Sequence, residues 1–192
     1  MVLDLFEYIS VLSSIIVGLG IAHLLRGVIG IIHHPEEGKP YWIHLIWVSS
    51  TFLLAVVWWW FQFNLAEIER WTFGSYVFVL TYSVTIYLLC AVLFPAHLAS
   101  FGNYKVFYYS KSPWYFSFFI VQRSVDIVDT FAKGGFDRFI GFGPEYWIGG
   151  PLQIILAGVA IFTRNEKFHA IFAIGVILLQ VSIAFRLFPA MG

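Results

Sequence analysis

Charged and polar side chains gather on one face of residues 114–133, an otherwise apolar segment. At 100° per residue along a helix, six of them fall within an arc of about 120°, opposite a face of Phe, Ile and Val. The six residues are Gln122, Arg123, Asp126, Asp129, Thr130 and Lys133. The segment therefore predicts a helix with an apolar face for lipid and a charged face for protein or water.

Arg123 is the most costly of these residues because of its expected depth. It lies nine residues after Trp114, about 14 Å along a helix and near the middle of a hydrocarbon core about 30 Å thick. A charge there costs at least ~2.5–3.5 kcal/mol and needs a partner. Asp126, at i+3, is the local candidate, and the partners expected from other segments are Asp4, Glu7 and Arg186. Such a network either fixes helix register or lines a route for ions or solutes. Because ionisable residues within a membrane are usually functional, the second interpretation is favoured.

The histidines form a second group of candidate residues. All six map to the same side of the membrane, opposite the termini. A neutral imidazole can relay protons or ligate a metal or haem iron, but no HxxxH spacing places two ligands on one helix. One hypothesis is a proton relay or a metal or haem site, and the other is a set of interfacial histidines bonded to loops, head groups and water. The residues considered are His23, His44, His97 and His169.

The composition defines the class of protein. Sixty per cent of the 192 residues are hydrophobic, 20% are aromatic and 11% are charged, with 11 basic and 11 acidic residues. Soluble domains carry charge on about 25% of their residues, so these values exclude a soluble monomer and a disordered chain. The zero net charge and the lack of a basic cluster argue against nucleic-acid binding. Cys90 is the only cysteine, and GxSxG, HExxH and P-loop motifs are absent, so no enzyme activity or cofactor is predicted.

Six segments are long and apolar enough to cross a bilayer, which needs about 20 mostly apolar residues. The breaks between them concentrate charge, Gly or Pro, and Trp and Tyr crowd their ends as an aromatic belt. We expect an all-α, polytopic integral membrane protein with about six transmembrane helices, forming a single transmembrane domain over residues 1–192. The first segment lacks a preceding basic region, so we expect it to be retained rather than cleaved. The segments are about 5–32, 41–63, 75–98, 114–133, 147–163 and 168–188.

The charges in the loops predict an orientation. With six spans both termini lie on one side, called side A here, and the first, third and fifth loops lie on side B. Side B carries six Lys and Arg residues against four on side A, with Arg123 left out. By the positive-inside rule side B is cytoplasmic and the termini are outside. We expect the protein in a bacterial cytoplasmic (inner) membrane.

Sequence landmarks recur in the two halves in the same order. Tyr-Trp-Ile opens the second and fifth segments, at 41–43 and 146–148, and Leu-Phe-Pro-Ala ends the third and sixth, at 93–96 and 187–190. A 3+3 repeat of residues 1–100 and 113–192 would be inverted, because each half has an odd number of spans. This arrangement is common in transporters. Gly149-Gly150-Pro151 then either marks a binding site at a broken helix or opens a short helix.

The first segment carries a face of small residues, which allows helices to approach closely. These are Ser14, Gly18 and Ala22. The partners expected are the lipid bilayer, further copies of the chain in a homo-oligomer, and a membrane partner protein.

These features predict a small multi-pass membrane channel or transporter. Arg123 supplies positive potential at mid-membrane, which favours an anion or an acidic solute, while Asp126, Asp129 and Glu7 tune that potential or carry protons. One alternative is a haem- or metal-binding membrane redox protein that uses the histidines. Another is an accessory membrane subunit or effector that packs with partner proteins.

Overall fold

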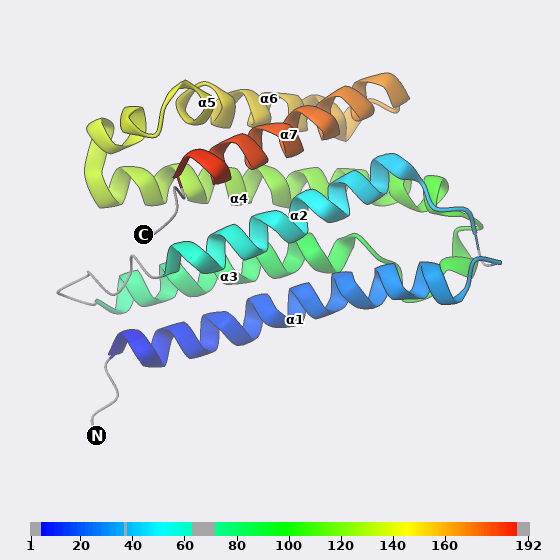
Figure 1. Ribbon diagram of the computed structural model, residues 1–192, viewed down its shortest axis with the longest axis horizontal. Helices are drawn as coiled ribbons and strands as arrows, with labels where there is room; N and C mark the ends of the chain where they lie inside the picture. The colour runs from blue at the N-terminus through cyan, green and yellow to red at the C-terminus, as the bar shows by residue number, and fades with distance from the viewer. Residues whose placement is uncertain (1–4, 37, 63–71, 188–192) are drawn as a thin grey trace.

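The computed structural model describes residues 5–36, 38–62 and 72–187, and no strand occurs among them. Its long helices run roughly along one common axis, from one end of the bundle toward the other (Figure 1). α1 begins and α7 ends at the same end, which corresponds to side A (Figure 1). The elements are α1 (Leu5–His33), α2 (Trp42–Phe61), α3 (Phe73–Val92), the 3-10 helix η2 (Leu98–Ser100), α4 (Tyr104–Gly141), α5 (Pro144–Trp147), α6 (Gly149–Phe162) and α7 (Glu166–Leu187).

Five helices are long and apolar enough to cross a membrane: α1, α2, α3, the α5–α6 segment and α7. The protein is therefore a helical protein of the integral membrane class, as predicted. The expected count of about six is not confirmed by this criterion. α4 lies outside the set because of its charged and other polar side chains, although it runs beside the other helices along the whole bundle (Figure 1).

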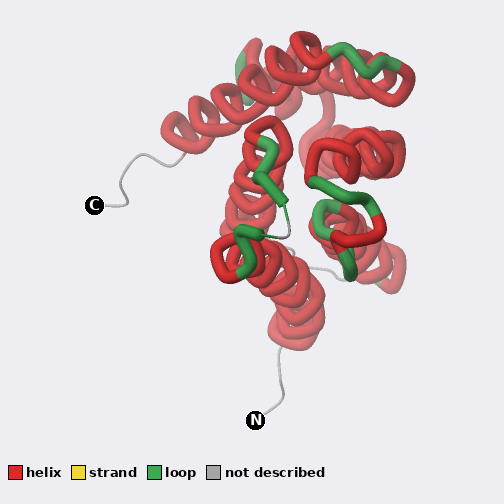
Figure 2. The backbone as a smooth tube through the Cα atoms, turned by 90° about the vertical axis from the view of Figure 1, so that its right-hand side faces the viewer, coloured by secondary structure: helices red, strands yellow, loops and turns green. Residues whose placement is uncertain are grey.

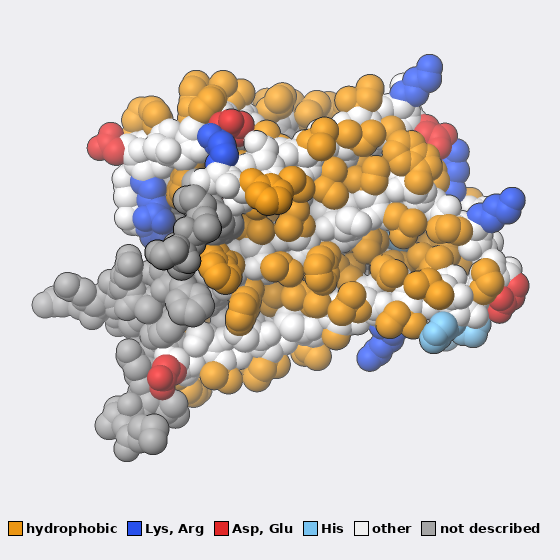
Figure 3. Space-filling model, in the orientation of Figure 1, with side chains coloured by type: hydrophobic (Ala, Val, Ile, Leu, Met, Phe, Trp, Pro, Cys, Tyr) orange, Lys and Arg blue, Asp and Glu red, His pale blue; other side chains and the backbone are white. Residues whose placement is uncertain are grey.

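The outer surface has the polarity that a bilayer requires. Apolar side chains cover the middle of the face shown in Figure 3, and its charged side chains lie mainly toward the two ends. Phe162 and Phe185 are 88% and 81% exposed. In water such exposure of large apolar side chains would make the surface prone to aggregation, whereas in a membrane the same side chains contact lipid.

α4 is much longer than the segment predicted for it, which was 114–133. It begins at Tyr104 because Asn103 caps it: Asn103 Oδ1 accepts from the backbone N–H of Val106 at 2.9 Å. The helix then continues through Pro113, whose missing N–H would leave the Tyr109 carbonyl without its helical partner. Ser112 Oγ donates to that carbonyl at 3.3 Å, so the proline is tolerated.

The predicted end of this segment at residue 133 is visible as a kink. Gly134 and Gly135 have non-helical dihedral angles, and Gly135 has a φ of +61°, a value that glycine adopts without steric cost. The short helical stretch after the kink ends at Gly141. α3, in contrast, ends at Val92 rather than at 98, because Pro95 lacks a donor and restricts the residue before it.

The helices pack in unequal pairs. α1 lies mainly against α3, α2 against α7, and α4 against α6, while α3 also contacts α4. Viewed along the bundle, they form an arrangement more than one layer thick (Figure 2). An inverted repeat would pair α4 with α7 as α1 pairs with α3, but α4 packs chiefly against α6. The proposed 3+3 repeat is not confirmed, and its last landmark, at 187–190, falls largely outside the described residues.

An aromatic cluster fills the side B half of the bundle. Trp47 of α2 is fully buried, and its ring lies 5.2–5.7 Å from the rings of four neighbours. Edge-to-face contacts of this kind add to the packing of a core. We call these five residues the aromatic plug: Trp47, Tyr115, Phe116, Phe119 and Phe172.

α1 approaches α3 and the residues that follow it through Gly20 and Gly27, which lie beside the predicted face of small residues. A Cβ atom at Gly27 would lie 2.2 Å from the ring of Phe94, and one at Gly20 would lie 3.2 Å from Cys90. Gly18 has no atom within 4 Å of its Cβ position, and Ala22 on the same face is exposed. Within the described chain, Gly20 and Gly27 make the close approach to Cys90 and Phe94, while Ser14 Oγ accepts a hydrogen bond from Trp59 Nε1 of α2 at 3.1 Å.

We expect Gly27→Ala to destabilise the fold by about 1–3 kcal/mol, because the added methyl group overpacks the α1–α3 contact. Unfolding of the purified protein in mixed micelles measures the change. Gly18→Ala on the same helix is the control and should cause no loss of stability. Equal stability of the two variants would contradict the packing described here.

Candidate functional site

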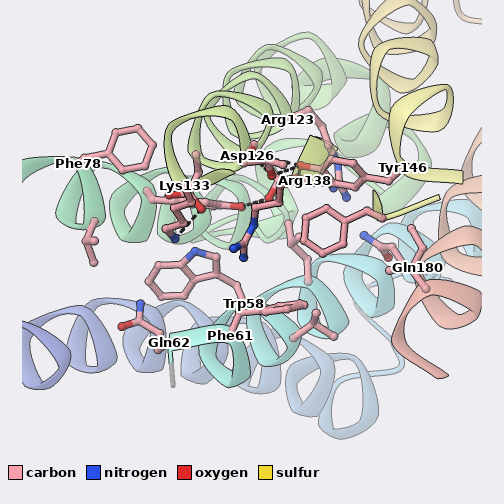
Figure 4. Close-up of a pocket in the computed structure, with 18 of the residues that line it drawn as sticks. Trp58, Phe61, Gln62, Phe78, Arg123, Asp126, Lys133, Arg138, Tyr146 and Gln180 are labelled. Atoms are coloured by element: carbon pink, nitrogen blue, oxygen red, sulfur yellow. Dashed lines mark hydrogen bonds and ion pairs between the residues drawn. The ribbon is translucent and has the colours of Figure 1, made fainter. Parts of the chain in front are cut away.

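A cavity of about 160 Å³ lies between α2, α3, α4, α5 and α7 in the side A half of the bundle (Figure 4). Apolar side chains make up much of its wall: Leu53, Leu54, Val57, Trp58, Phe61, Phe78, Val79, Phe142 and Ile183. The polar residues in the lining are Gln62, Tyr82, Arg123, Asp126, Asp129, Thr130, Lys133, Arg138, Tyr146 and Gln180. An apolar cavity with a few convergent polar groups is the usual form of a ligand site.

Arg123 lies deepest among the charged residues of the cavity. Its side chain is 12% exposed, and Nη1 lies 3.9 Å from Asp126 Oδ2. When the Gln180 side-chain amide is oriented so that both its oxygen and its nitrogen have hydrogen-bond partners, its oxygen accepts a hydrogen bond from Arg123 Nη2 at 3.2 Å. The guanidinium carbon is also 5.3 Å from the centre of the Phe119 ring. Nε is buried and has no hydrogen-bond partner, so the guanidinium keeps donor capacity for a further acceptor.

Asp126 is held by two tyrosines from other helices. The Tyr82 hydroxyl of α3 donates to Oδ1 at 2.5 Å, and the Tyr146 hydroxyl of α5 donates to Oδ2 at 3.0 Å. Gln122 Nε2 donates to the Tyr82 hydroxyl at 3.2 Å, and Thr130 Oγ1 lies 2.7 Å from the Tyr146 hydroxyl. Asp126 therefore ties α3 and α5 to α4.

The remaining charges lie toward the mouth of the cavity. Lys133 Nζ donates to Asp129 Oδ2 at 2.7 Å, one helical turn apart. Lys133 and Arg138 are exposed residues, so this end of the cavity faces the side A rim. Figure 4 shows Lys133 and Asp126 along α4, with Trp58 of α2 on the opposite wall. The lining thus has three cationic and two acidic side chains.

The aromatic plug closes the cavity toward side B. On α2, α4 and α7 alike, the plug residues come before the lining residues in the sequence, and all three helices run from side B to side A (Figure 1). Trp47, Phe116 and Phe119 are at most 1% exposed. Among the described residues, the aromatic plug therefore lies between the charged site and the side B end of the bundle.

Most of the predicted charge network is brought together, but two members are elsewhere. Arg123, Asp126, Asp129 and Thr130 line the cavity, and Gln122 donates to Tyr82 in its wall. Glu7 is exposed on α1, a helix that contributes no lining residue. Arg186 pairs with Glu145 at 3.0 Å outside the lining. Asp4 lies outside the described residues. These partners were inferred from depth alone, whereas lateral helix order decides which residues meet.

Tyr82, Tyr146 and Gln180 are site residues that sequence reasoning missed. Tyr146 was assigned to the aromatic belt, and the other two were not considered. A signal was present for two of them, since Tyr82 and Gln180 put polar groups within apolar spans, where unsatisfied polar groups are costly. For Tyr146 there was none, because belt tyrosines have the same sequence context.

The four candidate histidines occupy different environments on side B. His169 is buried, with Nδ1 2.8 Å from the Tyr108 hydroxyl and Nε2 2.9 Å from the Thr163 carbonyl. His44 is buried too, and its Nε2 lies 2.6 Å from the Leu93 carbonyl. His23 has a buried, unpartnered Nε2, and His97 is exposed. Among the described residues, no three His, Cys, Asp or Glu side chains gather as a metal site.

The fold and the site together define a helical protein of the integral membrane class, with a cavity that combines apolar walls and five charged side chains. Comparison of the chain with protein-family models, with curated proteins and with solved structures finds no significant match.

Proposed function

We propose that this protein is a membrane transporter that binds a small organic anion in the cavity. In this proposal α4 is a sixth membrane-crossing helix, whose apolar face contacts lipid and whose charged face lines the site. The observation that carries the proposal is Arg123, a cationic side chain that is 12% exposed, lies at the middle of α4 and lines the cavity.

The charge of the site favours an anion over a cation. The deep pair of Arg123 and Asp126 is loose, at 3.9 Å, while the carboxylate already accepts a hydrogen bond on each of its oxygens from a tyrosine, at 2.5 and 3.0 Å. The carboxylate is thus well satisfied and the guanidinium is not. Arg is suited to bind a carboxylate through two parallel hydrogen bonds, and Lys133 and Arg138 at the mouth attract anions from solution.

The walls of the cavity favour an organic body on that anion. The indole of Trp58 and the ring of Phe78 face the cavity from α2 and α3. Moving an apolar group out of water and against such walls is favourable. A carboxylate with a small aromatic or aliphatic body fits both parts of the lining, with its charge at Arg123.

The aromatic plug favours a transporter over an open channel. The site is reached from the side A end and is closed by buried rings on side B, as expected for one state of an alternating-access cycle. Transport then requires a second state in which α2, α4 and α7 part at the plug. The orientation of side A relative to the cytoplasm stays a prediction from the loop charges.

Binding of benzoate and of its neutral isostere benzamide to the purified protein tests the proposal. We expect benzoate to bind and benzamide to bind at least tenfold more weakly, because only the carboxylate pairs with Arg123. Proteoliposomes should accumulate radiolabelled benzoate above protein-free vesicles. Equal affinity for the two compounds, or no binding of benzoate, would contradict the proposed function.

A further inference from the structure

Asp126 is the group that an anion on Arg123 affects most directly. Arg123 is its nearest counter-charge, on the same helix, and the two side chains are 12% and 25% exposed. In the absence of an anion the two charges balance each other in the deep part of the cavity. A carboxylate bound to Arg123 lies beside Asp126. Its negative charge then pairs with the guanidinium that had balanced the Asp126 carboxylate.

The titratable groups that face Asp126 come from three elements. α3 provides Tyr82 and α5 provides Tyr146, both as hydroxyl donors. The lining residues from α2 and α7 are uncharged among the described residues, and α6, which packs on α4, has no charged residue. α4, including the stretch after its kink, provides Arg123, Asp129, Lys133 and Arg138.

The outer charges do not compensate for an anion at the deep position. Asp129 and Lys133 are paired at 2.7 Å, and Arg138 is exposed to solvent at the mouth. The deep part therefore holds one cation and one anion. A second negative charge there is costly because the surrounding walls are apolar and screening is weak. One proton on Asp126 restores neutrality.

We propose that Asp126 takes up one proton whenever an organic anion binds to Arg123, so that the protein carries the anion together with a proton. This inference rests on the proposed function. The proton comes from the aqueous phase at the mouth of the cavity and leaves with the anion. The two tyrosines suit both forms, because a hydroxyl donates to a carboxylate and accepts from a carboxylic acid.

The proposal fixes the sign of the pH dependence. The anion-bound state holds one proton more than the free state, so the apparent affinity for the anion rises as the pH falls. For one linked proton the change is at most about tenfold per pH unit. Benzoate itself stays ionised between pH 6 and 8, which makes this range suitable for the measurement.

Benzoate binding at pH 6, 7 and 8 tests the assignment. The wild-type affinity should rise about tenfold per unit as the pH falls over part of this range. Asp126→Asn, which mimics the protonated acid in shape and charge, should bind at pH 8 at least as tightly as the wild type at pH 6, without pH dependence. Asp137→Asn is the charge-matched control, since Asp137 is exposed and outside the lining, and it should keep the wild-type pH dependence.

Calorimetry of the wild type in two buffers of different ionisation enthalpy gives a second measurement, which does not depend on a variant that folds. We expect about one proton to be taken up per benzoate bound. Benzoate binding without pH dependence and without proton uptake would overturn the inference and leave the proposed function intact. An unchanged pH dependence in folded Asp126→Asn would show that the proton binds elsewhere, for instance as benzoic acid. A wild type that binds no benzoate at any pH would overturn both proposals.

Discussion

Arg123→Gln is expected to weaken benzoate binding by about 100-fold or more and to abolish uptake into proteoliposomes. The substitution removes the cation that the anion pairs with, deep in a cavity where water competes poorly. Loss of one member of a buried, hydrogen-bonded charge pair costs about 2–5 kcal/mol, and about 2.7 kcal/mol corresponds to a factor of 100 in affinity. Equilibrium binding at pH 6 and the initial rate of uptake measure the effect.

Two further variants separate loss of binding from loss of folding. Arg123→Gln leaves Asp126 without its counter-charge, which by itself destabilises the bundle. The double variant Arg123→Gln with Asp126→Asn removes both charges, so it should fold at least as well as the single variant and still fail to bind. Arg26→Gln removes an exposed arginine from α1, which contributes no lining residue, and should bind normally. Wild-type affinity in folded Arg123→Gln would refute the role of this residue.

Trp47→Ala is expected to give the largest loss of stability, about 3–5 kcal/mol, because it leaves a cavity in the middle of the aromatic plug. The indole of α2 is fully buried among Tyr115, Phe116 and Phe119 of α4 and Phe172 of α7. The free energy of unfolding in mixed micelles is the appropriate measurement.

Trp42→Ala is the matched control, since it is on the same helix and is 49% exposed. Its substitution should cost less than about 1 kcal/mol, as is usual for exposed positions. Trp47→Phe keeps an aromatic ring and should retain much of the stability that alanine loses. If Trp47→Ala and Trp42→Ala had the same effect, the plug would not be the centre of the core.

The sequence predicted the helices well where their formation depends on interactions between residues close in the chain. Apolar length gave five of the helices, and the glycines at 134 and 135 marked the break after the charged face of α4. The predicted start at residue 114 lies ten residues after the observed start of α4 at Tyr104. The capping by Asn103 and the Ser112 hydrogen bond both act within a single helix, but propensity alone favours a break at a proline.

The sequence predicted only part of the site. Whether a site residue was predicted depends on whether it lies on α4 or on another helix. Gln122, Arg123, Asp126, Asp129 and Thr130 were found because they share one face of one helix. Tyr82, Tyr146 and Gln180 were missed because they reach Arg123 or Asp126 from other helices. Glu7 was expected at the same depth as its partners, but α1 packs on the outer side of α3, away from α4.

The sequence by itself determined the class of protein and the charged face of α4, because hydrophobic length and helical periodicity are properties of continuous segments. Only the tertiary structure decided which residues surround Arg123, that the exposed charges of the cavity lie toward side A, and that buried aromatic rings lie between the cavity and side B. These depend on the lateral order of the helices. In an apolar bundle that order is set by the close packing of side chains such as Phe94 against Gly27, which leaves no periodic signal in the chain.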